Sequence, residues 1–408
     1  MSRRFLIVGK QFGNLKQAIL ARGDDFVLLR DIQGSRFTTN AGRRVMCDFS
    51  SKESVLRTVA TMPQKFDGVL TTYENYVCAT SWIAQHLGLP GMTEEAARAC
   101  TDKGLMRALF AQAPEKVSPD FSVIESLRDA EDFAEAHSFP LIIKPANLAK
   151  SLLVLKCHNH KELQENYQRM VSSLDNVYRK YAPNSTPKII LEEFLVGSIH
   201  SVDAFIDECG TVKVLDSIVD YQTGYDIGYD DNFHYSRIVP SKLSAAEQAA
   251  LKRVAAVGCK ALDMKSSPAH IEIIMTTEGP RIVEIGARNG GYRERMHKLA
   301  NDINLLELTL AIKLGESPQI EIKKNEPCAV LELFPKQAGI FAGIANEDQL
   351  KQLPSLQYYK IKQPLGNHVG KAGDGYKMCA VIILHNSDYD QFNRDLNYIN
   401  KSCFVKTS

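Results

Sequence analysis

The 408-residue sequence lacks a dominant charge, a long apolar run and any closely spaced pair of cysteines. Lys and Arg together number 49 and Asp and Glu 48, so the net charge is +1. A near-neutral chain gives no global electrostatic reason to expect nucleic acid or an anionic membrane as a partner. No run of 18 apolar residues occurs, so no membrane-spanning helix is expected. With 44% apolar residues, the composition excludes a disordered or fibrous chain.

The nine cysteines are scattered, and the two nearest, Cys78 and Cys100, stand 22 residues apart. Without a C-x-x-C pair, the sequence excludes a zinc ribbon and a thioredoxin-type motif. An odd, scattered set is typical of reduced thiols in a cytosolic protein. The first apolar stretch, Phe5–Val8, is too short for the core of a secretory signal peptide. We therefore expect a cytoplasmic protein.

The first hundred residues alternate short apolar runs with amphipathic segments, which predicts a parallel α/β sheet. The expected strands are Phe5–Val8, Phe26–Leu29 and Gly68–Thr72, and the expected helices are Asn14–Ala21, Glu53–Thr61 and Asn75–Leu87. The turn Gly9–Gly13 does not match the G-x-G-x-x-G pattern, so a dinucleotide site is not expected. We place this N-terminal domain at residues 1–98.

A second α/β section follows, expected as one domain at residues 99–316 with a small subdomain at about 115–190. Its expected strands are Phe139–Lys144 paired with Leu152–Leu155, then Ile189–Phe194, Ser201–Asp207, Val212–Val219 and a hairpin of Ile271–Met275 with Arg281–Ile285. Its expected helices are Lys161–Tyr181, Ser244–Leu262 and Arg293–Leu314. Polarity rises at Gly315–Pro327, so we place a C-terminal α+β domain at 317–408.

The strongest chemical signal is the segment His270–Gly291. On an antiparallel hairpin, Glu272 and Glu284 fall on neighbouring strands, flanked by Ile and Val. Two carboxylates in such surroundings are costly unless a cation compensates them, and Mg²⁺ bound to nucleotide phosphates suits them, with Mn²⁺ as an alternative. Arg288 offers a guanidinium fork, and the Gly290-Gly291 pair lets main-chain N–H groups approach an anion. The alternative is an ordinary hairpin with surface acids.

This segment and four others, in this order, resemble the ATP-grasp superfamily, specifically its carboxylate–amine (L-amino-acid) ligase branch. The other motifs are Thr71–Glu74, Thr101–Lys103, Leu141–Pro145 and Ile190–Gly197. The resemblance implies an α/β protein with a Rossmann-like N-terminal domain, a split α+β ATP-grasp domain and a C-terminal α+β domain. It also implies ATP as cofactor, with Arg288 as the catalytic residue and Glu272 and Glu284 as metal ligands.

The nucleotide residues come from the same resemblance. They are Lys103, Lys144, Lys150, Ser151, Glu192, Glu193 and Leu195. Lys144 also has its own physical argument, because a lysine at the end of an apolar strand is costly without an anion. Lys103 follows the expected helix cap Asp102, where a cation is electrostatically misplaced; a solvated lysine is the alternative. For Glu192 and Glu193 the alternative is a strand end with exposed acids.

The substrate residues are expected on three segments. Asp220–Ser241 is a polar, aromatic segment expected as a loop, in which Arg237 could bind a carboxylate bidentately and His234 stands three residues earlier. Glu74 ends a parallel strand, where α/β sheets bind ligands, and could hold a substrate ammonium. Gly290 and Gly291 complete the set. An ordinary surface loop and a solvent-exposed acid are the alternatives.

The sequence also departs from the family pattern at three places. The loop Ala146–Val154 has no glycine, Ile199 stands where the family often has a ribose-binding acid, and Gly286 replaces a metal-binding Asn. His200 is the neighbour that could substitute for the missing acid.

We therefore expect an ATP-dependent ligase that joins small-molecule carboxylate and amine substrates through an acyl phosphate. We expect it to act without nucleic acid or membrane, as a monomer or a homodimer. The alternatives are a non-catalytic ATP-binding module, or a ligase for a purine-pathway or D-amino-acid substrate.

Overall fold

The computed structural model describes residues 2–10, 14–33, 42–148, 152–181 and 185–408. The N-terminal part contains the expected parallel sheet, in the order β3-β2-β1-β4. Its strands are β1 (Arg4–Val8), β2 (Asp25–Asp31), β3 (Arg44–Cys47) and β4 (Gly68–Leu70), and its helices are α1 (Leu15–Ala21), α2 (Lys52–Ala60) and α3 (Val77–Leu87). The carboxyl end of β4 leads into a single 3-10 turn, Glu74–Tyr76, which places Glu74 at the edge of this part.

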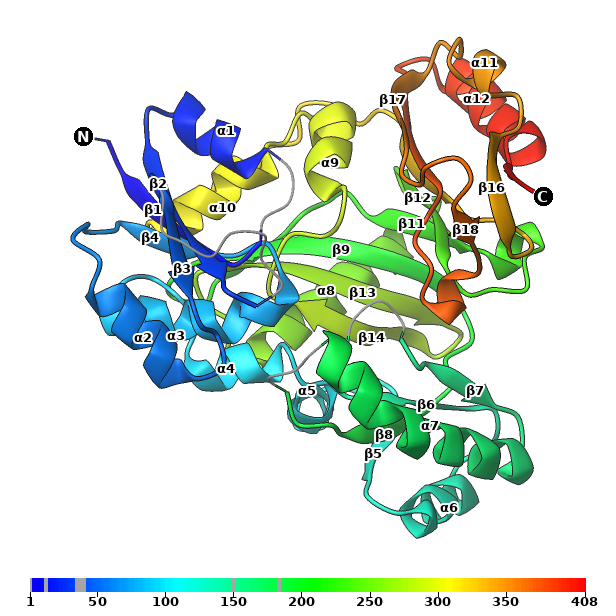
Figure 1. Cartoon of the computed structure of the whole chain (residues 1–408), viewed down its shortest axis with the longest axis horizontal. Coiled ribbons are helices and arrows are strands. Elements are labelled where there is room, and N and C mark those ends of the chain that lie inside the picture. The colour runs from blue at the N-terminus through cyan, green and yellow to red at the C-terminus, as the bar shows by residue number, and fades with distance from the viewer. Residues whose placement is uncertain (1, 11–13, 34–41, 149–151, 182–184) are drawn as a thin grey trace.

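Two short helices, α4 (Glu94–Ala99) and α5 (Lys103–Phe110), lead to a small antiparallel sheet in the order β5-β8-β6-β7. Its strands are β5 (Phe121–Ile124), β6 (Leu141–Pro145), β7 (Leu155–Cys157) and β8 (Ile189–Glu193), and α6 (Leu127–Ala136) and α7 (His160–Tyr181) pack on it. This part projects below the rest of the molecule in Figure 1. The expected strand at Leu152–Leu155 is wrong: Leu153 has a left-handed backbone (φ 55°), so the chain turns there and β7 begins only at Leu155.

A nine-stranded sheet forms the body of the molecule, in the order β14-β13-β9-β11-β12-β15-β19-β17, with β10 paired to β9. Its strands are β9 (Ser198–Ile206), β10 (Val212–Val214), β11 (Val219–Thr223), β12 (His234–Val239), β13 (Ser267–Thr276), β14 (Gly279–Gly286), β15 (Cys328–Leu333), β17 (Leu356–Ile361) and β19 (Ala380–His385). Because β12 pairs with β15, the sheet runs without interruption into the C-terminal segment. There α11 (Glu347–Leu350), α12 (Tyr389–Ser402), β16 (Gly339–Ile344), β18 (His368–Val369) and β20 (Val405–Thr407) complete the fold.

Three expected elements differ from the structure. The single strand expected at Val212–Val219 is two strands, β10 and β11, which pair with different parts of β9. The segment expected as a loop at Asp220–Ser241 begins in β11 and ends in β12, which pair with each other, and only the residues between these strands form a loop. The helix expected at Arg293–Leu314 is α9 (Arg293–Asn301) and α10 (Leu305–Lys313), because Asp302 adopts a left-handed conformation and Asn304 caps a new helix.

The largest apolar core holds the hairpin of β13 and β14 in place. Ile271, Ile273, Ile282 and Ile285 pack with helix α8 (Ala245–Ala261), and all four are completely buried. Burial of each such side chain stabilises the fold by about 1.5–3 kcal/mol. Since successive side chains on a strand point to opposite faces, this packing directs polar residues of the hairpin to the other face. No helix in the described part of the chain combines the length and apolarity needed to cross a membrane.

Gly197 precedes β9 where that strand meets the end of β13. A Cβ at this position would overlap the main-chain carbonyl of Met275. We therefore expect Gly197→Ala to lower the free energy of unfolding by about 1–3 kcal/mol, the usual cost of overpacking. Urea unfolding would measure this change, with Val196→Ala as control, because Val196 is 72% exposed. Equal stability of the two variants would contradict the close approach.

Candidate active site

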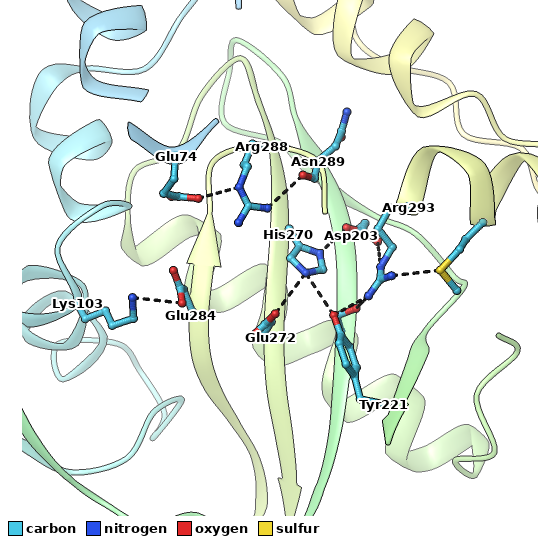
Figure 2. Close-up of polar contacts among 12 residues, drawn as sticks. Glu74, Lys103, Asp203, Tyr221, His270, Glu272, Glu284, Arg288, Asn289 and Arg293 are labelled. Carbon is cyan, nitrogen blue, oxygen red and sulfur yellow. Dashed lines mark hydrogen bonds and ion pairs between the residues drawn. The ribbon is translucent and has the colours of Figure 1, made fainter. Parts of the chain in front are cut away.

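The two acids of the hairpin lie directly opposite each other. Glu272 on β13 pairs in register with Glu284 on β14, as the sequence predicts, and both side chains remain about a quarter exposed. Each has a basic neighbour (Figure 2): Lys103 Nζ lies 3.2 Å from Glu284 Oε2, and His270 Nε2 lies 3.6 Å from Glu272 Oε1. Burial raises the pKa of Glu272, but His270, His234 and Arg288 together lower it by more than burial raises it. The net pKa of Glu272 is therefore well below the usual range. The hairpin therefore presents an ionised Glu272 beside the carboxyl group of Glu284.

Lys103 is a buried part of this arrangement and not the solvated lysine that the sequence left open. It is the first residue of α5, after the cap Asp102, whose carboxylate accepts from the N–H groups of Gly104 and Leu105. Its ammonium donates to the carbonyl of Leu148 at 3.2 Å in addition to its ion pair with Glu284. The unfavourable position at a helix N-terminus is thus offset by a carboxylate and a carbonyl.

Arg288 connects the N-terminal part to the hairpin. Its Nε lies 2.8 Å from Glu74 Oε2, and its Nη1 donates to the main-chain oxygen of Asn289 (Figure 2). Burial raises the pKa of Glu74, Arg288 lowers it and Glu284 raises it again, with a net increase. Arg288 occupies Oε2 of Glu74, whereas the other carboxylate oxygen, Oε1, is buried and has no hydrogen-bond donor in the described part of the chain. Glu74 can therefore still accept hydrogen bonds from a ligand, and it lines a pocket together with Lys103 and Glu284.

The two glycines after Arg288 have different surroundings. A Cβ at Gly290 would lie 2.5 Å from Nδ1 of His270, so only glycine permits this close packing. A Cβ at Gly291 would have no atom within 4 Å, so this residue faces open space. The space beside Gly291 is available to a bound group.

Asp203 is the centre of a buried charge cluster that the sequence analysis missed. Its carboxylate lies 2.8 Å from His270 Nδ1, 3.1 Å from His297 Nε2 and 3.5 Å from Arg293 Nε. Burial raises the pKa of Asp203, but His270, His297 and Arg293 lower it well below its usual value. The contact with Nδ1 leaves Nε2 of His270 facing Glu272 and the hydroxyl of Tyr221. An acid in the apolar strand Ser201–Asp207 was the available signal, since a buried charge needs partners.

A second buried cluster lies where the nucleotide is expected. Lys144 Nζ is 2.5 Å from one carboxylate oxygen of Glu192, and Arg107 Nε is 2.9 Å from the other. Arg107 also donates to the carbonyl of Val283 on β14. The sequence argument that Lys144 requires a ligand anion is therefore incomplete, because Glu192 already supplies a buried negative charge. Burial lowers the pKa of Lys144 despite this partner.

The other expected nucleotide residues are distributed as follows. The carboxylate of Glu193 turns outward, where it accepts from the N–H of Asp120 at 2.9 Å and lies 3.5 Å from Lys116. The N–H of Leu195 forms no hydrogen bond within the described ranges of the chain. Lys150 and Ser151 lie outside the described residues.

His200 does not stand in for the acid that Ile199 replaces. Since Ser201 contacts Arg293 on the face of the acids, His200 points to the opposite face of the sheet. There its Nδ1 lies 2.8 Å from Asp220 and its Nε2 lies 2.6 Å from Ser198.

Arg237 and His234 lie on β12 and not on a loop. Arg237 Nη1 is 3.2 Å from Glu332 Oε2 on β15, and its guanidinium lies 5.8 and 5.7 Å from the ring centres of Tyr221 and Tyr292. The fork expected to be free for a substrate carboxylate thus already has an internal acid. His234 is largely enclosed, its ring lies edge-on to Tyr221, and burial lowers its pKa.

Removing the charge of Asp203 is expected to destabilise the protein strongly. Asp203→Asn should lower the free energy of unfolding by about 3–5 kcal/mol, because Arg293 would lose its buried counter-charge. The folded-state pKa lies below the ordinary 3.8, so this stabilisation is present above pH 3.8 and is lost as the pH falls below it. Urea unfolding at pH 7 and below 3.8 would measure both effects.

The matched control is Asp216→Asn. Asp216 forms an ion pair with Lys252, but its side chain is 71% exposed. An exposed pair contributes about 0–1 kcal/mol, so this variant should remain close to the parent protein. A similarly small effect of Asp203→Asn would show that the buried cluster contributes little.

Comparison with known proteins concerns the fold. Residues 137–295 match the model of an ATP-grasp domain. The structure superposes on that of L-amino acid ligase from Bacillus licheniformis with a TM-score of 0.79, 21% identity and 100% coverage of both chains. Phosphoribosylglycinamide synthetase from Anaerococcus prevotii gives a TM-score of 0.70 with 17% identity and 100% coverage of both.

Among curated proteins, alanine–anticapsin ligase of Bacillus subtilis (strain 168) is 24% identical over 252 residues, which are 59% of this chain and 52% of that protein. An uncharacterized protein of Sinorhizobium fredii is 21% identical over 331 residues, which are 80% and 66%. The chain thus spans about half to two thirds of the length of these curated relatives. It carries an ATP-grasp domain, and its full length has the ATP-grasp fold that the sequence motifs predict.

Proposed function

We propose that the protein is an ATP-dependent ligase that joins a carboxylate to an amine, with an amide or dipeptide as the product. The observation that carries this proposal is the cross-strand pair Glu272–Glu284 with Arg288 and Lys103 beside it. Two carboxylates and two cations in one cleft suit phosphoryl transfer, in which positioning and electrostatic stabilisation supply most of the catalysis. Relatives named as amino-acid ligases support the choice of carboxylate and amine substrates.

ATP would lie between the small antiparallel sheet and the hairpin. Lys103 and Lys144 are the cations assigned to its phosphates. The main chain near Glu193 and the N–H of Leu195 are assigned to the adenine, with the carboxylate of Glu192 nearby. Lys150 and Ser151 are assigned to the phosphates by the family resemblance alone.

The residues present fit a magnesium ion. Glu272 and Glu284 would hold it, since Mg²⁺ binds through one or two carboxylates together with phosphate oxygens, and Mn²⁺ accepts the same ligands. When bound, the ion would neutralise phosphate charge. A soft metal would not fit this pair, because both side chains offer only oxygen atoms.

The proposed reaction has two steps. In the first, a carboxylate oxygen of the substrate attacks the terminal phosphorus of ATP, the bond to the bridging oxygen breaks, and ADP leaves. In the second, the amine nitrogen attacks the carbonyl carbon of the acyl phosphate, loses a proton and expels phosphate. Arg288 would stabilise the developing negative charge, and Glu74 would hold the substrate ammonium through Oε1, the carboxylate oxygen that does not face Arg288. Gly290, Gly291, His234 and Arg237 would line the remaining substrate space.

We also propose that the protein is located in the cytoplasm. All nine cysteines are unpaired, which supports a location in the reducing cytoplasm.

The decisive experiment is a screen of ADP release over pairs of amino acids and carboxylic acids, with products identified by mass spectrometry. Formation of an amide that depends on ATP would establish the ligase. ATP binding without turnover for any pair would favour a non-catalytic module. Release of ADP only with phosphoribosylamine or with D-amino acids would identify the alternative ligase classes.

Glu284→Gln should reduce Mg²⁺-dependent ADP formation by roughly two orders of magnitude or more, because the metal ion that would compensate the phosphate charge loses one of its carboxylate ligands. The change preserves shape, so the fold should stay intact, but the melting temperature should fall somewhat, because Lys103 would keep only the carbonyl of Leu148 as a partner. Steady-state kinetics would measure the effect, with Glu278→Gln as control on the same hairpin, where the side chain is 82% exposed. Unchanged turnover in Glu284→Gln would remove Glu284 from the metal site.

Lys144→Met should weaken ATP binding about 10- to 100-fold, the range expected for loss of one charge-assisted contact. The melting temperature should also fall, because Glu192 would keep only Arg107 as its buried partner. The double variant Lys144→Met with Glu192→Gln should be less stable still, because the completely buried Arg107 would have no acid left, and it should not regain ATP affinity. Calorimetric binding and thermal unfolding of the parent and both variants would separate the two roles, and parent-like ATP affinity in Lys144→Met would make Lys144 purely structural.

A further inference from the structure

A second pocket lies behind the proposed active site, where the N-terminal part meets the body of the molecule. Its walls come from the end of β4, from α3, from the turn after Pro90, from the start of β13 and from the end of α10. The lining residues used below are Thr80, Ser81, Gly91, Met92, Ser267 and Lys313. Thr71 and Ala287 also line it. Thr71 lies three residues before Glu74, and Ala287 lies directly before Arg288.

Lys313 differs from the other buried lysines. Of the three lysines that are buried among the described residues, Lys103 pairs with Glu284 and Lys144 with Glu192. Lys313 is 6% exposed, yet it has no ion pair and no hydrogen bond to any described residue. An ammonium group in this position is costly unless something outside the chain compensates it.

Two of the residues that line the pocket also have main-chain donors without partners. The N–H groups of Gly91 and Met92 form no hydrogen bond within the part of the chain that the structure describes. A Cβ at Gly91 would lie 2.6 Å from the Cβ of Ala84, so glycine is needed for the turn to approach α3 this closely. The surroundings of Lys313 thus leave more than one donor unsatisfied.

The hydroxyl groups of the pocket do not supply a negative charge to pair with the ammonium of Lys313. Thr80 donates to the carbonyl of Tyr76 at 2.7 Å, Ser81 to that of Cys78 at 2.9 Å. Ser267 likewise donates to the carbonyl of Pro268 at 2.9 Å. These groups are neutral, and no acid contributes to the pKa of Lys313, which burial alone lowers to about 8. A small negatively charged group is the complement of this lining.

We propose that this pocket is a binding site for a small oxyanion, held by the ammonium of Lys313 and the main-chain N–H groups of Gly91 and Met92. The pocket holds about 20 Å³, little more than one water molecule, and opens to solvent, so the ligand is a free oxyanion, or the terminal carboxylate or phosphate group of a slender molecule, that reaches Lys313 with one or two oxygen atoms. This site goes beyond the proposed ligase activity and does not depend on it.

The test observes Lys313 directly. In protein labelled with ¹³C at the lysine Cε, the Cε shift of Lys313 would be titrated with pH in sodium chloride, then with phosphate or acetate at matched ionic strength. The resonance is assigned by its absence in Lys313→Met. An oxyanion that binds should raise the pKa of Lys313 above about 8, since a nearby negative charge favours the ammonium form. A response to phosphate alone or acetate alone would identify the class, and no response to either would overturn the proposal.

Phosphate is also expected in the proposed nucleotide site, so the two sites need to be separated. In Lys144→Met, the response of Lys313 to the oxyanion should persist, because Lys144 belongs to the other site. In Lys313→Met, the rise in melting temperature caused by the oxyanion should be smaller than in the parent, and Lys313→Arg, which retains the charge, should restore part of it. The same rise in Lys313→Met and in the parent would overturn the assignment. Failure of the ligase screen would leave these readouts unaffected.

The pH dependence of stability gives an independent check. The folded-state pKa of about 8 lies below the ordinary value of 10.5, so the buried ammonium costs stability below pH 8 and this cost disappears between pH 8 and 10.5. The melting temperature of the parent should therefore rise relative to Lys313→Met as the pH increases from 7 to 10 in chloride. Saturating oxyanion at pH 7 should produce a similar relative gain. A difference between parent and variant that is constant from pH 7 to 10 would contradict an uncompensated ammonium.

Discussion

The compensation of buried charge is the constraint on which the rest of this structure depends. The apolar face of the β13–β14 hairpin packs against α8, and this packing fixes Glu272 and Glu284 opposite each other on the other face. Negative charges on neighbouring carboxyl groups repel each other, and basic side chains around them offset this repulsion. Lys103 comes from α5, His270 from the same strand as Glu272, and Arg288 from the loop after β14. Ion pairs with these acids thus connect parts of the chain that are distant in sequence.

Helix α5 has a particular place in this arrangement. Lys103 and Arg107 stand one helical turn apart, so they point to the same side of the helix. Lys103 contacts the hairpin acid Glu284, and Arg107 contacts both Glu192 on the small antiparallel sheet and the carbonyl of Val283 on the hairpin. A rigid helix therefore connects the two walls between which a nucleotide is expected. Because Glu192 has Arg107 as well as Lys144, Lys144 could turn toward a phosphate without leaving a buried carboxylate unpaired.

The sequence predicted local features well and long-range partners poorly. The parallel sheet, the capped helix after Ser244 and the opposition of Glu272 and Glu284 follow from periodicity and capping within short windows, and the structure confirms them. The break between α9 and α10 was missed because it depends on a single left-handed residue, Asp302, inside a helical pattern. The partners of Lys144 and Arg237 were also missed. Such ion pairs join strands that are brought together only by the tertiary fold, and no local pattern identifies them.

Asp203 and Lys313 show two different ways of burying a charge. Asp203 is nearly inaccessible, and two imidazoles and a guanidinium surround its carboxylate, so the chain itself supplies its counter-charge. Lys313 is almost equally buried, but the described side chains that line its pocket are neutral hydroxyl and apolar groups. A fold that compensates its other buried lysines with acids has no evident structural use for this uncompensated one. The difference is understandable if the counter-charge of Lys313 is a ligand, because a site that binds an anion has to remain short of negative charge until the anion arrives.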